Sequence, residues 1–523
     1  MSDAVATTEW RPHANPWLIA LAVMLATFMV ILDTSIAVVA LPYIAGNLGA
    51  TQDESTWVLT SYLVANAIIL PASTWLSGYF GRKNFLIACT LIFTAASLLC
   101  GLATTMPMLV AARVLQGLGG GAMQPLSQAI LLESFPPAKR GAATALFGIA
   151  IVVAPILGPT LGGWLTDNWS WRWTFYINLP VGILAFFLMS WLVEDPPYIR
   201  ARHTSRFDGI GFGLIALSLG TLQIVLDKGQ DADWFDAVWL RWFAVICVLS
   251  LVGFIVRELY IKHPLVDLRV FKDRNFTVSC FLFGLFGVML YALITIQPLF
   301  LQTLLGYNAF NSGLSVSPRG VGAFVALFFV GALVGRVDSR LLAGLGFAMM
   351  GLASFLLCRL SLQMAMGNIV FANIFAGFGT GCIFVPLTTL SVGTLHNEQI
   401  GNAISLQNLI RNTGGSIGLS LVSTLQERFA QAHQSMMVGQ LSPLNPQYQQ
   451  KSEMLQNIFE QRFSSADALA RTHGLLYRTL LQQSNYWSFI NLFFLLACVC
   501  GICVFGIFLF AKPKNVHAMA AAE

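Results

Sequence analysis

The sequence has few charged residues. Asp, Glu, Lys and Arg make up 10% of its 523 residues, whereas soluble proteins contain about 25%. Hydrophobic residues account for 56%, and the mean hydropathy is +0.71. This composition excludes an ordinary soluble domain and predicts a polytopic membrane protein. The net charge of +5 is modest and gives no reason to expect a nucleic-acid partner.

The sequence also lacks the motifs of common catalytic sites. It has no Gly-rich phosphate loop, no paired catalytic carboxylates and no His/Cys cluster with metal-ligand spacing. All nine cysteines lie in apolar segments, which argues against a disulfide framework and against a thiolate metal site. The short polar stretch Met1–Pro16 leads into a full-length span without a cleavage pattern, so we expect no removable signal peptide. An enzyme, a metal and an organic cofactor are therefore not expected.

The long apolar runs predict fourteen membrane spans, since a bilayer core takes about 20 apolar residues per helix. They lie near 17–41, 55–77, 85–105, 107–131, 141–165, 173–193, 209–227, 237–258, 275–301, 312–335, 341–361, 366–393, 402–425 and 486–511. An even number puts both termini on one side. Most Lys and Arg lie on that side, whereas the short loops of the other side hold only Arg172, Lys228, Arg241 and Arg359. This bias predicts cytoplasmic termini.

A weak internal repeat indicates two halves. Segments 74–83 and 331–340 share Leu at the third place, Gly at the fifth and a basic residue at the tenth, and each follows the second span of a six-span set. This predicts two six-helix halves related by an axis along the membrane normal. The predicted divisions are a cytoplasmic N-terminus 1–16, an N-terminal half 17–195, a linker with two additional helices 196–274, a C-terminal half 275–511 and a cytoplasmic tail 512–523.

The C-terminal half includes a long polar loop, 426–485, predicted to lie outside the membrane on the periplasmic side. It contains segments with helix-like apolar spacing. Loops of this length are usually functional or disordered. The segment is therefore either a solvated spacer or a docking surface for an extracytoplasmic partner.

Four charged residues lie deep inside the predicted spans, away from the span ends: Asp33, Arg113, Arg319 and Arg411. A charge in hydrocarbon costs at least about 2.5–3.5 kcal/mol, so such residues usually face a bundle interior or a water-filled cavity. Asp33 lies roughly 12 Å and Arg113 about 9 Å below the outer ends of their spans, so both can face one cavity. Asp33 is the candidate proton carrier and Arg113 its tuning partner. The alternative is a structural ion pair that never titrates.

Other polar residues at membrane depth are candidates for lining a substrate cavity. They are Asn66, Gln116, Gln124, Gln128, Asn178 and Gln297, together with Arg319 and Arg411. Hydrogen bonding between helices is the alternative role for the amides. Arg319 either snorkels outward or contacts an anionic group, and Arg411 either clamps a backbone or contacts substrate.

The fifth span combines prolines and glycines: Pro155, Gly158, Pro159, Gly162 and Gly163. Proline frees backbone carbonyls and kinks a helix, and glycine lets a neighbouring helix approach closely. Ordinary membrane-helix packing explains such a segment as well as a special function does.

Several motifs together resemble one family. They are Leu32–Pro42 in the first span, Arg113–Gly117 in the fourth, Ala154–Gly163 in the fifth, and, more weakly, Asn275–Thr277 and Pro386–Thr389. The chain resembles the drug/proton antiporters of the major facilitator superfamily with fourteen spans, and is most similar to the EmrB group of multidrug efflux pumps. One motif departs from the family pattern: Gly78 and Tyr79 stand where the loop after the second span usually has Asp and Arg.

The resemblance implies an all-α major facilitator fold and the export of toxic lipophilic compounds, such as drugs, uncouplers and weak acids, driven by the proton gradient. It implies a bacterial inner-membrane pump working with a periplasmic adaptor of the EmrA type and an outer-membrane channel of the TolC type. It also implies that the fifth-span motif is a hinge or a seal against proton leak. The alternative function is proton-coupled uptake of a small metabolite, against which the antiporter-like sequence of the fifth span argues.

Overall fold

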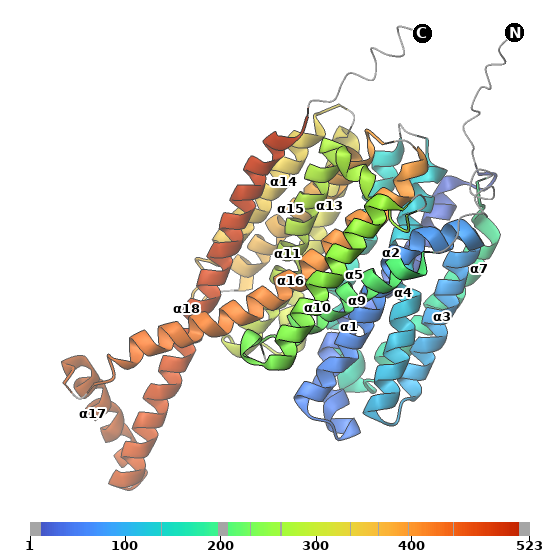
Figure 1. Ribbon diagram of the computed structural model, residues 1–523. Coiled ribbons are helices and arrows are strands. Elements are labelled where there is room, and N and C mark those ends of the chain that lie inside the picture. The colour runs from blue at the N-terminus through green and yellow to red at the C-terminus, as the bar shows by residue number, and fades with distance from the viewer. Residues whose placement is uncertain are drawn as a thin grey trace, which may run out of the picture.

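The computed structural model describes residues 12–136, 139–196, 208–230, 232–261, 264–334, 336–364, 366–395, 397–442 and 444–511. It is a bundle of long helices with one projecting arm (Figure 1). The first seven helices form the N-terminal half. They are α1 (Pro16–Leu48), α2 (Gln52–Phe80), α3 (Arg82–Leu102), α4 (Met106–Ser134), α5 (Arg140–Asn168), α6 (Trp173–Tyr176) and α7 (Asn178–Leu192). The predicted tails and the first part of the linker, residues 197–207, lie largely outside the described residues.

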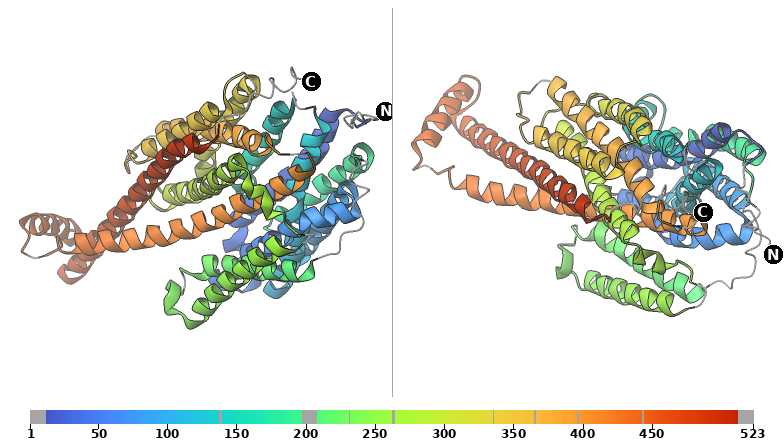
Figure 2. Two further views of the ribbon diagram at one scale, coloured as in Figure 1. Left: turned by 45° about the horizontal axis from the view of Figure 1, so that its top comes forward. Right: turned by 90° about the horizontal axis from the view of Figure 1, so that it is seen from above.

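Two linker helices follow, and then the C-terminal half. The linker contains α9 (Gly209–Lys228) and α10 (Val238–Tyr260), with the short turns η2 (Trp234–Asp236) and η3 (Leu268–Lys272). The C-terminal half consists of α11 (Arg274–Thr303), α12 (Ala309–Val316), α13 (Pro318–Leu333), α14 (Ser339–Leu357), α15 (Met366–Val392), α16 (Asn397–Val438), α17 (Pro446–Glu460), α18 (Ser465–Gly506) and η4 (Ile507–Leu509). Figure 2 shows the green α9–α10 pair at the side of the bundle.

Local sequence explains several helix boundaries. Thr51 caps α2 through a capping box, in which its Oγ accepts a hydrogen bond from the Glu54 backbone N–H and the Glu54 carboxylate accepts one from the Thr51 N–H. Gly49 ends α1 in the left-handed conformation with φ 63°, which glycine adopts without strain. At the start of α9, Asp208 accepts hydrogen bonds from Arg257 of α10, which lowers the pKa of the Asp208 carboxyl and ties the two linker helices together.

Helices lie at all fourteen predicted spans, two of which are divided, between α6 and α7 and between α12 and α13. Among the described residues, 11 helices are long and apolar enough to cross a bilayer, or up to 12 if the bent α5 counts as one span. The helices α4 and α16 fall outside this set. Both carry buried polar side chains, including Arg113 and Arg411, which lower their hydropathy. The multi-pass all-α architecture is clear, and the exact number of fourteen remains a prediction.

The two halves use the same helix contacts. In α4, Gly117 and Gly121 pack against the backbone of α2, and Gly119 packs against α3. In α15, three glycines with the same spacing, Gly377, Gly379 and Gly381, pack against α13 and α14. A Cβ at any of these positions would collide with the neighbouring helix. The internal repeat therefore extends well beyond the loop segments that first indicate it.

Most of the segment predicted as a loop, 426–485, is helical. Helices α16 and α18, of 42 residues each, run without a break from the bundle into an arm that α17 completes at its tip (Figures 1 and 2). The buried side chains Ala468, Thr472, Leu476, Leu480 and Ser484 recur at every fourth position of α18. This spacing places them on one face of the helix, which explains why a polar segment continues as a helix beside α16.

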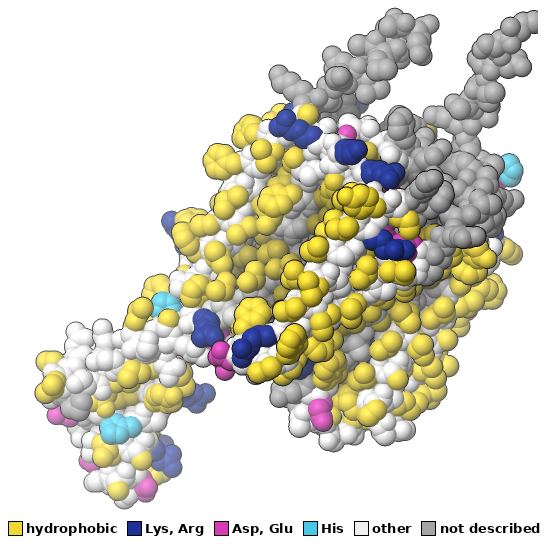
Figure 3. All heavy atoms as spheres, in the orientation of Figure 1, with side chains coloured by type: hydrophobic (Ala, Val, Ile, Leu, Met, Phe, Trp, Pro, Cys, Tyr) yellow, Lys and Arg dark blue, Asp and Glu magenta, His cyan; other side chains and the backbone are white. Residues whose placement is uncertain are grey.

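The arm lies at the opposite end of the bundle from the start of α1 and the end of α18 (Figure 1). In the space-filling view, hydrophobic side chains cover much of the flank, and several Lys and Arg side chains gather at the end where α1 begins and α18 finishes (Figure 3). This distribution suits a molecule whose flank faces lipid.

Candidate functional site

The centre of the N-terminal half contains a buried ion pair. The Arg113 Nη1 of α4 donates to the Asp33 Oδ2 of α1 over 2.6 Å. Asp33 is 1% exposed and Arg113 is 0% exposed. The structure thus brings together the two charges that helix depth placed at a similar level, and it shows the direct contact that the sequence alone leaves open.

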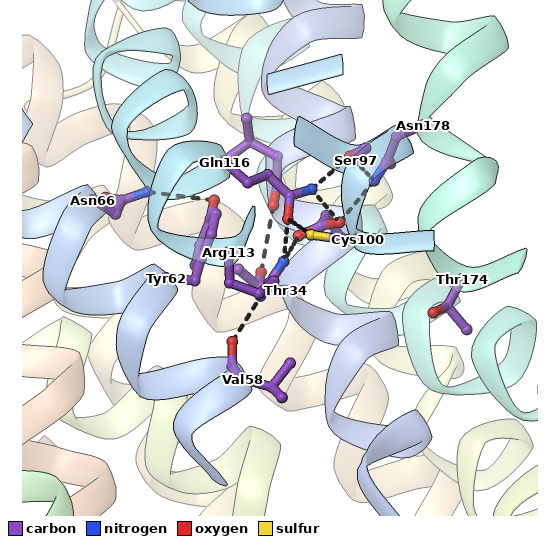
Figure 4. A network of polar contacts seen from close by, with 12 residues as sticks. Thr34, Val58, Tyr62, Asn66, Ser97, Cys100, Arg113, Gln116, Thr174 and Asn178 are labelled. Carbon is purple, nitrogen blue, oxygen red and sulfur yellow. Dashed lines mark hydrogen bonds and ion pairs between the residues drawn. The ribbon is translucent and has the colours of Figure 1, made fainter. Parts of the chain in front are cut away.

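Amide groups complete the coordination of the carboxylate. The Asp33 Oδ1 accepts hydrogen bonds from the Gln116 Nε2 at 2.9 Å and from the Asn178 Nδ2 at 2.7 Å. Both amides also donate to the Ser97 Oγ of α3 (Figure 4). One carboxylate therefore joins α1 to α4 and α7, and Ser97 extends the network to α3.

The guanidinium of Arg113 is held on several sides. Its Nε donates to the Val58 carbonyl of α2 at 2.9 Å, and its Nη1 also donates to the Gln116 Oε1 at 2.6 Å (Figure 4). The Tyr62 ring lies beneath it, 4.3 Å from the guanidinium carbon, which adds a cation–π contact. Its Nη2 is buried without a hydrogen-bond partner in the described part of the chain. If the Asp33 charge were lost, this cation would be left in a dry site without an anion.

The sequence predicts some of this network and misses the rest. Gln116 and Asn178 are predicted as cavity candidates, but they contact Asp33 directly. Gln116 stands three residues after Arg113 on the same helix, a spacing that puts both on one face. Tyr62 and Ser97 are not predicted, because a tyrosine or a serine in an apolar span looks like ordinary packing.

The fifth-span motif lies directly beside this site. Helix α5 bends by 41° between Pro155 and Thr160. Pro159 has no N–H to donate to the Pro155 carbonyl four residues earlier, and the Ser35 Oγ of α1 donates to that carbonyl instead, over 2.9 Å. Gly158 also packs against Ser35, and Gly162 against Ile36. The bend of α5 is therefore held by the helical turn of α1 that carries Asp33. Gly163 belongs to the same segment of α5 and is buried.

The C-terminal half contains a different buried cation. Arg319 of α13 is 3% exposed, and its Nη2 donates to the Gln297 Oε1 of α11 at 2.6 Å and to the Asn373 Oδ1 of α15 at 3.0 Å. Arg319 points into the bundle and does not snorkel to the surface. Among the described residues, its hydrogen-bond acceptors are neutral amides.

The remaining candidates are spread over the bundle. Gln128 of α4 accepts a hydrogen bond from Asn408 of α16 at 3.1 Å, which joins the two halves. Asn66 donates to the Tyr62 hydroxyl at 3.4 Å, and Gln124 is 9% exposed. Arg411 is 4% exposed and donates to the neighbouring Asn412. The close approach of α16 to α11 is made beside Arg411, by Gly414 and Gly418 against Gly284 and Val288.

Comparison with known proteins decides the family. The model of the Major Facilitator Superfamily matches residues 23–419. The chain belongs to the Major Facilitator Superfamily. This is a family of transporters, and the chain is accordingly a multi-pass membrane protein. A 13% identical solved structure, that of the human organic anion transporter MFSD10, covers 93% of this chain and 99% of its own with a TM-score of 0.55, and shows the same fold.

Within the superfamily, several similar proteins are bacterial resistance or multidrug export proteins. The fatty acid resistance protein FarB of Neisseria gonorrhoeae is 37% identical, with 95% of this chain and 96% of the relative covered. The multidrug export protein EmrB of Escherichia coli is 34% identical, with 94% of each covered. The colistin resistance protein EmrB of Acinetobacter baumannii is 30% identical, with 95% and 97% covered. The predicted resemblance to the EmrB group is confirmed.

Proposed function

We propose that this protein is a proton-coupled antiporter that exports toxic lipophilic compounds, including drugs and weak acids, across the bacterial inner membrane. The observation that carries the proposal is the buried carboxylate of Asp33, paired with Arg113 in the interior of a transporter half. A carboxylate is the side chain that can take up and release a proton at this depth. The similar resistance and multidrug export proteins support export as the direction of transport.

Protonation of Asp33 would act through the contacts of its carboxylate. A neutral Asp33 no longer balances the charge of Arg113, and the charge-assisted hydrogen bonds that join α1 to α4 and α7 weaken. Any shift of α1 then reaches α5, because Ser35 binds the carbonyl exposed at the α5 bend. Proton uptake from outside and release inside would in this way bias the rocking of the two halves.

The test is transport by the Asp33→Asn variant in proteoliposomes with an imposed proton gradient. Asparagine keeps the size of the side chain but binds no proton, so we expect gradient-driven export to fall to the level of empty vesicles, while substrate exchange without a gradient continues. Asp236→Asn, which changes an exposed acid, is the matched control and should transport normally. Unchanged gradient-driven export by Asp33→Asn would refute the coupling role, and inward substrate movement in the wild type would indicate a symporter.

The arm supports a proposal about partners. With the termini in the cytoplasm, as the Lys and Arg bias predicts, the arm projects into the periplasm. Its tip helix α17 has no buried residues. Nearby apolar side chains are well exposed, including Leu444 at 91% and Met454 at 63%. Such side chains outside a membrane typically mark a protein interface. An adaptor of the EmrA type, leading to an outer-membrane channel of the TolC type, is the partner that suits this surface.

A further inference from the structure

Arg319 carries a buried positive charge that the protein does not neutralise. Its side chain is 3% exposed, and the two oxygens that accept from its Nη2 belong to the amides of Gln297 and Asn373. No Asp or Glu among the described residues forms an ion pair with it. A buried guanidinium normally has a charged partner, because amide oxygens only partly replace the water that it has lost.

The internal repeat shows what is unusual about this arrangement. Gly117 packs against the backbone of Tyr62, and its counterpart Gly377 packs against the backbone of Arg319. Arg113 precedes Gly117 by the same number of residues as Asn373 precedes Gly377. The buried arginine thus lies on α4, the fourth span of the N-terminal half, but on α13, in the second span of the C-terminal half. In the N-terminal half, the Asp33 carboxylate balances the charge of Arg113. In the C-terminal half, Gln297 of α11 offers Arg319 only a neutral amide.

Two hydrogen-bond donors at Arg319 remain unused. The Arg319 Nε and the Gln297 Nε2 are buried and have no hydrogen-bond partner in the described part of the chain. Gln297 is 0% exposed. Unsatisfied buried donors are costly, and an oxyanion can accept from both while neutralising the guanidinium. The other buried arginine of this half, Arg411, donates to Asn412 and has no such unpartnered nitrogen.

We propose that Arg319 and Gln297 bind the anionic group of amphiphilic, singly charged substrates such as carboxylates, and that Arg319 thereby selects organic anions among the exported compounds. A single cation matches a single negative charge, and the Arg319 Nε and the Gln297 Nε2 are the donors that remain for the oxygens of a carboxylate. This assignment rests on the proposed export function and gives it a substrate class.

The experiment measures equilibrium binding to the full-length protein in lipid nanodiscs, using octanoate and, with reversed charge, octylammonium. We expect Arg319→Gln to weaken octanoate binding at least about tenfold, as loss of a charge-assisted contact predicts, and to leave octylammonium binding unchanged or stronger. Arg359→Gln, which changes an exposed arginine of the same half, should bind octanoate like the wild type. Equal octanoate affinity of Arg319→Gln and the wild type would overturn the assignment.

Thermal unfolding separates this role from a purely structural one. Without ligand, Arg319→Gln should unfold at the same temperature as the wild type or higher, because the substitution removes an unbalanced charge. The stabilisation that octanoate gives the wild type should disappear. A lower unfolding temperature with octanoate affinity retained would reject the anion site. If Arg319→Gln does not fold, Gln297→Met tests the same site: octanoate affinity should fall by about two- to tenfold, and an unchanged affinity would reject it.

The binding assay uses no proton gradient, so its result is independent of coupling. The two proposals can therefore fail separately. If the wild type shows no gradient-driven export but binds octanoate, and Arg319→Gln abolishes this binding, the proposed function is rejected and the anion site is supported.

Discussion

At the scale of single residues, the two halves treat a buried arginine in opposite ways. Arg113 is balanced by the carboxylate of Asp33, which also accepts from Gln116 and Asn178. Arg319 is surrounded by neutral amides. In the first arrangement, protonation can remove the negative charge of Asp33. In the second, only a bound anion can neutralise the positive charge of Arg319. Proton and substrate would therefore act in different halves of the molecule.

The Asp33–Arg113 pair allows a prediction about stability. Asp33→Asn alone leaves Arg113 buried without an anion and should destabilise the protein by about 3–5 kcal/mol. The neutral double variant Asp33→Asn/Arg113→Gln should recover most of this loss, because neither charge remains. It should still fail to couple export to the proton gradient. Unfolding in detergent and transport in proteoliposomes, measured on the same preparations, check both statements, and gradient-driven export by the double variant would contradict them.

The sequence predicts the position of these residues better than their partners. Helical rise alone puts Asp33 and Arg113 at similar depths, because both lie in long apolar helices of known direction. It does not give rotation about the helix axis, so the Asn178 contact and the position of Tyr62 beneath Arg113 need the folded structure. The inward direction of Arg319 could not be predicted either, since an arginine near the outer end of a span can also snorkel.

At the scale of helices, α1 and α5 form one unit with the proton site. Ser35 and Ile36 contact the bent segment of α5, and Asp33 lies on the same turn of α1. The bend at Pro155–Thr160 leaves a carbonyl that α1 satisfies, so the two helices cannot move independently without losing a hydrogen bond. The fifth-span motif thus has a clear structural basis, and its use as a hinge remains a proposal.

A glycine substitution tests this unit. Gly158→Ala places a methyl group against Ser35, so we expect a loss of about 1–3 kcal/mol in stability and a marked decrease in export. Gly213→Ala in α9 is the matched control, because a Cβ there has no atom within 4 Å. It should export normally and unfold at the same or a slightly higher temperature. Normal export and stability of Gly158→Ala would contradict this prediction, because they would show that α1 and α5 can move apart without loss of function.

Part of the helical structure of the arm could be predicted from the sequence. The apolar residues Ala468, Leu476 and Leu480, which are buried on α18, are separated by multiples of four positions, a spacing that indicates a helix even in a polar segment. The sequence does not show that this helix and the last span are one continuous helix. The hydropathy changes where the bundle ends, whereas the helical backbone continues unchanged.

At the scale of the whole molecule, the bundle and the arm have separable tasks. The bundle contains the buried arginines Arg113, Arg319 and Arg411, whereas the tip of the arm presents exposed apolar side chains. The base of the arm is fixed to the linker helices, where Trp234 donates to Thr424 at 3.2 Å. Transport across the bilayer should therefore depend on the bundle, and delivery beyond the membrane should depend on the tip.

Substitutions at the tip check this division. Replacing Leu444, Met454 and Ile458 together with Gln removes exposed apolar side chains but should leave the fold and transport in proteoliposomes unchanged. In cells that contain the partner proteins, resistance should fall to nearly that of a strain without the protein. The control pair Gln450→Ala and Lys451→Ala changes exposed polar positions of the same helix and should keep full resistance. Full resistance of the triple variant would refute docking at the tip.

The unbroken helices of the arm have a mechanical consequence. A helix of 42 residues is about 63 Å long, so each degree of tilt of the C-terminal half would move the far end of α16 by about 1 Å relative to its start. The arm would therefore act as a lever that amplifies small rotations within the membrane. A partner attached to the tip would be displaced once in every transport cycle, in step with the proton.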